Sequence, residues 1–297
     1  MVFSTEKILA ASERRQGLLR QKTNAVRIVD GDGDDLPGLF IDNFAGRWLV
    51  QEKAAAERPE LALTLGYRSL YWKSLVKEPS QSPAYLDGEP VTRPFEINEN
   101  GLTYTVDFQA GYSQGIFLDQ RDNRRHVREN VTGKRVLNTF AYTCAFGVSA
   151  AAGGASTVNL DLSRRYLEWG KRNYVLNGID AQSHEFIYGD VFDWLNRFRR
   201  RSQTFDVIIL DPPTFSRDRK SSIFRVEEDY GKLLELALSC LAFPGSILCC
   251  TNSHRISQSA FASILRRAIC RPFNMTARAM PADFTGRQYL KTAWLEF

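Results

Sequence analysis

The sequence has few cysteines and histidines, and they are not spaced as disulfide partners or metal ligands usually are. The five cysteines are an odd number without a C-x-x-C pair, and the three histidines lie far apart. A disulfide framework and a structural zinc site are therefore not indicated. We expect no metal.

Long apolar runs and targeting signals are also missing. No apolar stretch approaches the roughly 20 residues that cross a bilayer. The first residues, MVFSTEKILAASERRQG, lack the basic-then-apolar order of a secretory signal. These absences predict a cytoplasmic protein without a membrane partner. With 297 residues, the chain can form one large domain and a smaller one.

The N-terminal third predicts a small domain. Residues 3–22 have a helical pattern, LFIDNFAGRWLVQE (39–52) indicates two strands around a turn, and ERPELALTLG (57–66) indicates a helix. The segment EPSQSPAYLDGEPVTRP is rich in proline and turn residues and indicates a boundary near its end. We predict an N-terminal helix over 1–22, a small α+β domain over 23–93 that helps recognise the substrate, and a catalytic domain over 94–297.

The stretch VDGDGDD, Val29 to Asp35, resembles a calcium-binding loop because aspartates occupy alternate positions. It departs from the full pattern, since Asp35 replaces the glycine at position six and Ile41 replaces the glutamate at position twelve. A tight acidic hairpin turn is the favoured interpretation.

After residue 100, short apolar stretches alternate with helical patterns. The strand-like stretches are at 136–137, 157–160, 185–188, 206–210 and 246–250. Continuous apolar strands between helices are typical of a parallel sheet covered on both faces. The pattern predicts a doubly wound α/β domain whose ligand lies beyond the carboxyl ends of the strands.

Four consecutive expected strands end on polar residues, namely Asn138, Asp161, Asp190 after a glycine, and Asp211. Asp161 lies 23 positions after Asn138, a spacing that suits a ribose diol. Asp190 could accept a hydrogen bond from the amine of adenine. Both aspartates could instead cap the helices that follow them. Together they favour an adenosine-containing ligand.

The loop after the first of these strands, NTFAYTCAFG, has no G-x-G-x-x-G. Dinucleotides need glycines there so that backbone N–H groups can reach the pyrophosphate. A dehydrogenase is therefore disfavoured, and S-adenosylmethionine, which has no phosphate, is the better candidate.

The segment ILDPPTFSR places Asp211 at a strand end, followed by two prolines that remove N–H donors and fix φ. A carboxylate and rigid carbonyls could hold a flipped-out base, with Phe215 as a stacking surface. A stiff loop without substrate contact is the alternative. A basic segment, NRFRRR from Asn196 to Arg201, is either a solvated helix end or a phosphate-contacting patch.

Four segments, GYSQGIFLDQRDNRR, VLNTFAYTCAFGVSAAAGGA, VNLDLSRRYLEWGKRNYVLNGID and DVIILDPPTFSR, resemble the class I S-adenosylmethionine-dependent methyltransferases of large-subunit ribosomal RNA, both cytosine-C5 enzymes and the guanine-N7 module. The resemblance covers about residues 105–297, and DGDGDDLPGLFIDNFAGRWLV is similar to the start of the family's small domain. It implies a mostly parallel, seven-stranded Rossmann-like methyltransferase sheet. The cytosine enzymes usually begin with a PUA domain, which we expect this chain to lack.

The resemblance also implies a set of site residues. Those toward the methionine end of the cofactor or the substrate are Gln120, Arg121 and Arg124. Those in the loop around the cofactor are Asn138, Phe140, Ala141, Tyr142 and Thr143. Those at the ribose and adenine are Asp161, Leu162, Ser163, Asp190, Val191 and Phe192. Asp211 and Pro212 face the methyl group. Cys144 and Ala145 stand where many members have two glycines.

The cytosine enzymes add a thiolate to the base, and the position of that cysteine falls here on Asn252. Cys250 lies two residues earlier, and Cys249 faces the other way. This favours methylation of a guanine nitrogen, with Asn252 as a positioning residue. The alternatives are cytosine-C5 chemistry through Cys250, a small-molecule or protein substrate, and a non-enzymatic cofactor- or RNA-binding module. We expect large-subunit ribosomal RNA as partner, and the oligomeric state stays open, a homodimer included.

Overall fold

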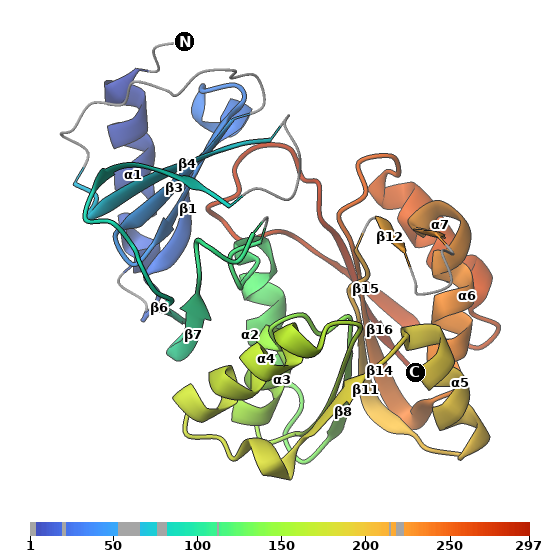
Figure 1. Ribbon diagram of the computed structural model, residues 1–297. Helices are drawn as coiled ribbons and strands as arrows, with labels where there is room; N and C mark the ends of the chain where they lie inside the picture. Colours follow the sequence, from blue (N-terminus) through green and yellow to red (C-terminus); the bar gives the residue numbers. More distant parts are fainter. Residues whose placement is uncertain are drawn as a thin grey trace. The chain divides into compact units, whose positions relative to one another are not determined.

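The computed structural model describes residues 4–19, 22–52, 66–75, 82–111, 113–213, 215–217 and 223–297, with the backbone alone at 215–217, 223 and 224. The chain forms two compact units (Figure 1). The first comprises Met1–Arg121 and Pro281–Gln288, and the second comprises Asp122–Met280 and Tyr289–Phe297. The helix expected at 57–66 falls, apart from Gly66, outside the described residues.

In the first unit, one helix covers a five-stranded sheet. Ile8 and Ala11 of the helix are fully buried and pack against apolar strand residues such as Val26 and Ile41. Ala45 and Gly46 both have positive φ, as a tight hairpin turn requires. The expected first helix and the two strands around this turn are confirmed. In sheet order the elements are α1 (Thr5–Leu19) on β1 (Ala25–Asp30), β2 (Leu39–Phe44), β3 (Arg47–Glu52), β4 (Ser69–Ser74) and β5 (Ala84–Gly88).

A second hairpin, β6 (Phe95–Glu99) and β7 (Leu102–Val106), also belongs to the first unit. The Asn24 backbone N–H donates to the Asn98 carbonyl at 2.9 Å, and the Asn98 N–H donates to the Asn24 side chain at 2.6 Å. The boundary between the two units therefore differs from the boundary predicted after residue 93, because these hydrogen bonds join the hairpin to residues that precede β1. The first unit continues through η2 (Leu118–Gln120) to Arg121.

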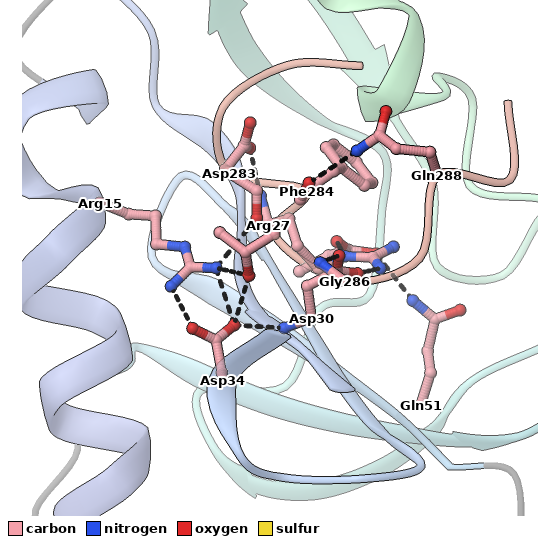
Figure 2. A network of polar contacts seen from close by, with 11 residues as sticks. Arg15, Arg27, Asp30, Asp34, Gln51, Asp283, Phe284, Gly286 and Gln288 are labelled. Carbon is pink, nitrogen blue, oxygen red and sulfur yellow. Dashed lines mark hydrogen bonds and ion pairs between the residues drawn. The ribbon is translucent and has the colours of Figure 1, made fainter. Parts of the chain in front are cut away.

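The segment Pro281–Gln288, which we call the strap, lies in the chain between β15 and β16 of the second unit yet packs in the first unit. Figure 2 shows its polar contacts. The buried Arg15 guanidinium donates to both oxygens of Asp34 at 2.6 and 2.7 Å and to the Asp283 carbonyl at 3.0 Å. One arginine therefore joins α1, the acidic turn and the strap.

The acidic turn forms η1 (Gly31–Asp34), and Asp35 after it is left-handed. The carboxylates of Asp30 and Asp34 face arginines and backbone donors. Asp30 accepts from Arg27 at 2.8 Å and from the Gly286 N–H at 2.7 Å (Figure 2). Among the described residues, no group of three or more His, Cys, Asp or Glu side chains could hold a metal ion. These aspartates thus serve to anchor the strap.

The second unit is a seven-stranded sheet in the order β10-β9-β8-β11-β14-β16-β15. The first five strands are mutually parallel, and β16 is antiparallel to both neighbours. Helices α2, α3 and α4 lie on one side of the sheet and α5, α6 and α7 on the other (Figure 1). The doubly wound, mostly parallel seven-stranded fold is confirmed. In the described residues, no helix is long and apolar enough to span a bilayer.

Its elements are α2 (Arg121–Glu129), β8 (Arg135–Thr139), α3 (Ala145–Ala152), β9 (Ser156–Asp161), α4 (Arg164–Leu176), η3 (Ala181–Ser183), β10 (Glu185–Tyr188), α5 (Val191–Arg200), β11 (Phe205–Leu210), β12 (Phe215–Arg217), β13 (Ile223–Arg225), α6 (Val226–Leu238), β14 (Leu241–Thr251), α7 (Gln258–Ala268), β15 (Asn274–Arg278) and β16 (Lys291–Glu296).

Candidate cofactor and substrate site

The sheet register brings the polar strand ends to one level. Thr139 of β8 pairs with Leu160 of β9 on one side and with Leu210 of β11 on the other. Asp161 and Asp211 each follow by one residue, so they stand at the same edge with one strand between them, about 10 Å apart. From β8 the chain continues to β9 on one side, whereas from β11 it continues to β14 on the other. The strand order therefore reverses between β8 and β11. Ligands of doubly wound sheets bind at such a switch point.

The loop after β8 has an unusual backbone. Phe140, Tyr142 and Cys144 have φ of 52°, 50° and 58°, a left-handed conformation that non-glycine residues seldom adopt. The Ala141 N–H between them donates to the Leu160 carbonyl at 3.0 Å. Conformational strain of this kind is concentrated at ligand sites. The loop predicted to surround the cofactor is thus fixed by β9.

Asp161 is held by two backbone N–H groups. One carboxylate oxygen accepts from the Tyr142 N–H and the other from the Ser163 N–H, both at 2.8 Å. Burial raises the pKa of Asp161, and these two hydrogen bonds act in the opposite direction. Each oxygen retains a further lone pair that can accept from a ribose hydroxyl.

The cap of the following helix is Ser163, whose hydroxyl accepts from the Tyr166 N–H at 3.3 Å. The capping alternative considered for Asp161 therefore belongs to Ser163. Asp190 does cap its helix, because its carboxylate accepts from the Asp193 N–H at 3.0 Å. Next to it, Val191 is buried in the core, and Phe192 packs partly buried against the same core.

Asn138 lies inside the domain rather than on its surface. It is 1% exposed, and its amide donates to the Asn159 side-chain oxygen at 3.0 Å. Asn159 in turn donates to the Tyr174 hydroxyl at 3.0 Å. A Cβ on Gly147 would lie 2.0 Å from the Asn159 oxygen, so this position must be glycine. The sequence signal for this cluster was Asn159, an asparagine inside the apolar stretch 157–160, which was not among the predicted site residues.

Cys144 is buried, and burial raises its pKa well above the ordinary value. A Cβ on Gly170 of α4 would lie 2.3 Å from the Cys144 sulfur. Gly170 therefore makes room for the Cys144 side chain, at the position where the resemblance predicts a glycine. The neighbouring Thr143 carbonyl accepts from the Asn173 amide at 3.0 Å, which also fixes the loop against α4.

The DPPTF segment follows β11. Asp211 is half-buried, and Pro212 is buried. The Leu210 carbonyl just before them accepts from the Tyr230 hydroxyl of α6 at 3.1 Å. The side chain of Phe215, expected to stack on a base, lies outside the described residues.

Three candidate residues lie at the end of β14. Cys249 and Cys250 are fully buried within the strand, whereas Asn252 is exposed directly after it. Burial raises the pKa of Cys249 to about 12. The Cys250 sulfur lies 3.9 Å from the Thr292 hydroxyl of β16.

Lys291, which is not among the predicted site residues, fixes the loop that carries Asn252. It is 6% exposed, and its ammonium donates to the carbonyls of Ser253 and, at 2.9 Å, of Tyr289. A lysine in an apolar strand near the C-terminus was the available signal.

The three residues expected at the methionine end are described within their own units. Gln120 and Arg121 belong to the first unit, and Arg121 binds both oxygens of Asp283. Arg124 belongs to the second unit, is buried, and lies 5.9 Å from the centre of the Phe146 ring. Their contacts with the cofactor stay predictions.

The donor and acceptor set fits S-adenosylmethionine. Asp161 and Asp190 follow β9 and β10 at the edge where the resemblance expects a ribose and an adenine, and the loop after β8 lacks the glycines of a phosphate-binding loop. The parallel sheet and this edge define a nucleoside-binding methyltransferase site.

Comparisons with known proteins give the same class. A family model of S-adenosylmethionine-dependent methyltransferases matches residues 68–273. Ribosomal RNA large subunit methyltransferase I of Aeromonas salmonicida is 36% identical over 280 residues, which are 90% of this chain and 70% of the relative. The enzyme of that name from Escherichia coli is 34% identical over 285 residues, 90% and 71% of the two chains.

Among solved structures, SMU.776, a methyltransferase complexed with SAH, has a TM-score of 0.87 at 28% identity and covers 100% of this chain and 83% of its own. The protein is an S-adenosylmethionine-dependent methyltransferase. It belongs to the family of large-subunit ribosomal RNA methyltransferases whose members include ribosomal RNA large subunit methyltransferase I.

Proposed function

We propose that the enzyme methylates a base of large-subunit ribosomal RNA at a nitrogen, with guanine as the favoured base. The names of its relatives support the RNA class. The observation that carries the choice of atom is the exposed amide of Asn252 directly after β14, where the resemblance to the cytosine enzymes places their nucleophilic cysteine.

Methylation at cytosine C5 needs a thiolate that reaches C6 of the base, because C5 is a poor nucleophile. The two cysteines near Asn252 are poorly suited to this step. Both are fully buried in the sheet, and burial raises the pKa of Cys249 to about 12. An amide cannot replace a thiolate. A guanine nitrogen such as N7 carries an in-plane lone pair and needs no covalent step, so alignment suffices.

Bound S-adenosylmethionine supplies an electrophilic methyl group on its sulfonium. The chain's residues orient the reactants. Asp161 accepts from the ribose hydroxyls, and Asp190 accepts from the adenine amine. Asp211 accepts from an N–H on the edge of the base, and Pro212 and Pro213 beside it have carbonyl acceptors but no backbone N–H donor. The exposed Asn252 amide, which both donates and accepts, sets the rotation of the base.

The test uses methyl-labelled S-adenosylmethionine, deproteinised large-subunit ribosomal RNA and nucleoside mass spectrometry of the product. We expect labelled 7-methylguanosine. Labelled 5-methylcytidine would overturn the choice of atom, and its loss in Cys250→Ala would assign that cysteine as nucleophile. No label on naked RNA, subunits or assembly intermediates, with cofactor binding intact, would favour a small-molecule or protein substrate.

Two variants separate the roles within this site. Asn252→Ala should reduce transfer by about 10- to 100-fold while cofactor affinity stays the same, because one hydrogen bond to the base is lost. Cys250→Ser should retain transfer, since its sulfur takes no part. If Asp211→Ala kept full methyl transfer, the assignment of the DPPTF segment to the base would be wrong.

A further inference from the structure

The edge of the second unit's sheet opposite the candidate site carries an exposed aromatic ring. Leu241 of β14 pairs with Phe205 of β11, and the next pair is Ser246 with Val207. Four residues of β14 therefore bulge opposite one residue of β11. Phe243 in this bulge is 79% exposed, the largest exposed fraction among the exposed large hydrophobic side chains that the structure describes.

The bulge is fixed to its surroundings rather than loose. The Phe205 N–H donates to the Cys240 carbonyl at 2.9 Å on one side. On the other side, the Phe297 N–H donates to the Gly245 carbonyl at 3.0 Å. The backbone that presents Phe243 is thus anchored at both ends.

Arginines lie on both sides of the bulge. Helices α5 and α7 start at the candidate-site edge, so their C-termini reach the opposite edge with the start of β14. The last turn of α5 contributes Arg199 and Arg200, and Arg201 follows it. The last turn of α7 contributes Arg266 and Arg267. All five are exposed.

A contact places the end of α5 beside the start of β14. The Cys240 thiol donates to the Leu195 carbonyl of α5 at 3.4 Å, and the charge of nearby Arg199 opposes the effect of burial, which raises the pKa of Cys240. Near the Gly245 end of the bulge, the Arg271 guanidinium lies 4.4 Å from the centre of the Phe297 ring. Asp206, opposite the bulge, and Glu235 and Glu296, near the ends of α6 and β16, are the acidic residues here, so the five arginines and Arg271 leave positive charge in excess.

Cations at helix C-termini stabilise the helices, and this alone would explain the arginines. It does not explain an exposed ring fixed between two groups of them. Aromatic rings that stack on bases, flanked by cations that bind phosphates, are the common recognition surface for single-stranded nucleic acid.

We propose that this surface, the arginine edge (Phe243 with Arg199, Arg200, Arg201, Arg266 and Arg267), binds a single-stranded segment of the RNA substrate, with Phe243 stacked on a base. The inference rests on the proposed function. The length of β11 places the arginine edge about 20 Å from Asp211, so it contacts RNA remote from the target base. It therefore provides affinity and takes no part in methyl transfer.

The test measures binding of a fluorescent 20-nucleotide single-stranded RNA of mixed sequence by anisotropy, over a range of salt concentrations. Phe243→Ser should weaken binding by about 5- to 100-fold. Arg200→Ala with Arg201→Ala should lower the salt slope by about 1.4, at about 0.7 per phosphate contact. The matched controls are Val175→Ser and Arg172→Ala, which remove exposed side chains from α4 on the other face of the sheet.

Calorimetric binding of S-adenosylmethionine checks that each variant is folded, and it should be unchanged. If the wild type methylates ribosomal RNA while the arginine-edge variants bind and methylate RNA normally, this inference is wrong and the proposed function stands. If the wild type neither binds nor methylates RNA, both fall. If Phe243→Ser converts a dimer into a monomer, by light scattering, without a change in RNA affinity, the surface is a protein interface instead.

Discussion

Arg121 and Asp283 form a buried, two-pronged ion pair across 162 positions of sequence. The guanidinium donates to one carboxylate oxygen at 3.0 Å and to the other at 2.5 Å, and the two side chains are 5% and 0% exposed. The same Asp283 carboxylate accepts from the Arg27 N–H at 2.9 Å. The pair is part of the contacts that hold the strap in the first unit.

Removal of one partner from this pair should destabilise the first unit strongly. Asp283→Asn and Arg121→Met should each lower the free energy of unfolding by about 3–5 kcal/mol, because a buried charge loses its partner. The double variant should lose less than the sum, as a double-mutant cycle in urea would measure. The control is Arg68→Ala, which breaks an exposed pair with Glu89 and should cost at most about 1 kcal/mol. Additive losses would show that the pair is not coupled.

The strap should also depend on Gly33. A Cβ at this position would lie 2.3 Å from the Thr285 carbonyl carbon, so Gly33→Ala must displace the strap. We expect a loss of about 1–3 kcal/mol and faster hydrogen exchange of the Gly286 N–H, which is bonded to Asp30. Gly17→Ala in α1 meets no atom within 4 Å and should be neutral or stabilise by about 0.5–1 kcal/mol. Equal behaviour of the two variants would contradict the close packing at Gly33.

Cofactor affinity should depend on pH through Asp161. Its pKa is raised by burial, so the carboxylate is protonated at a higher pH than an exposed aspartate. Affinity should be constant above that pKa and fall by up to about tenfold per pH unit below it, because the protonated group is a weaker acceptor. Asp161→Asn should weaken binding by about 10- to 100-fold and remove this dependence. Calorimetric titration of cofactor binding across pH tests both expectations, with Asp180→Asn, a change at an exposed aspartate, as control. If Asp161→Asn kept the pH dependence of the wild type, another group would be its cause.

Gly170 and Cys144 should behave as a pair. Gly170→Ala should shift the loop after β8, since the new Cβ would lie 2.3 Å from the Cys144 sulfur. This shift should weaken cofactor binding and also lower the free energy of unfolding by about 1–3 kcal/mol. Cys144→Gly should restore both in the double variant, because it removes the sulfur and suits a φ of 58°. Gly231→Ala, in open space on α6, is the matched helical control. If Cys144→Gly gave no rescue, the contact would not be the cause.

The helices and strands of the catalytic sheet were largely predictable because their signal is local. The alternation of apolar runs with helical patterns predicted β8 to β11 to within a few residues and a helix after each of the first three strands. The grouping of β6 and β7 was not predictable, since it depends on hydrogen bonds between Asn24 and Asn98. The fit of Gly170 against Cys144 likewise depends on how α4 packs, which no periodicity records.

By itself, the sequence determined a parallel sheet whose strands end on polar residues. The carboxyl ends of parallel strands lie at one edge of the sheet, whatever elements connect the strands. This fixed Asp161 and Asp211 at that edge and made S-adenosylmethionine the better-fitting ligand. Only the tertiary structure decided that Arg121 pairs with Asp283, that the acidic turn anchors the strap, and that the Phe243 side chain is exposed. Those relationships join residues far apart in sequence, and packing, not local pattern, sets which distant side chains meet.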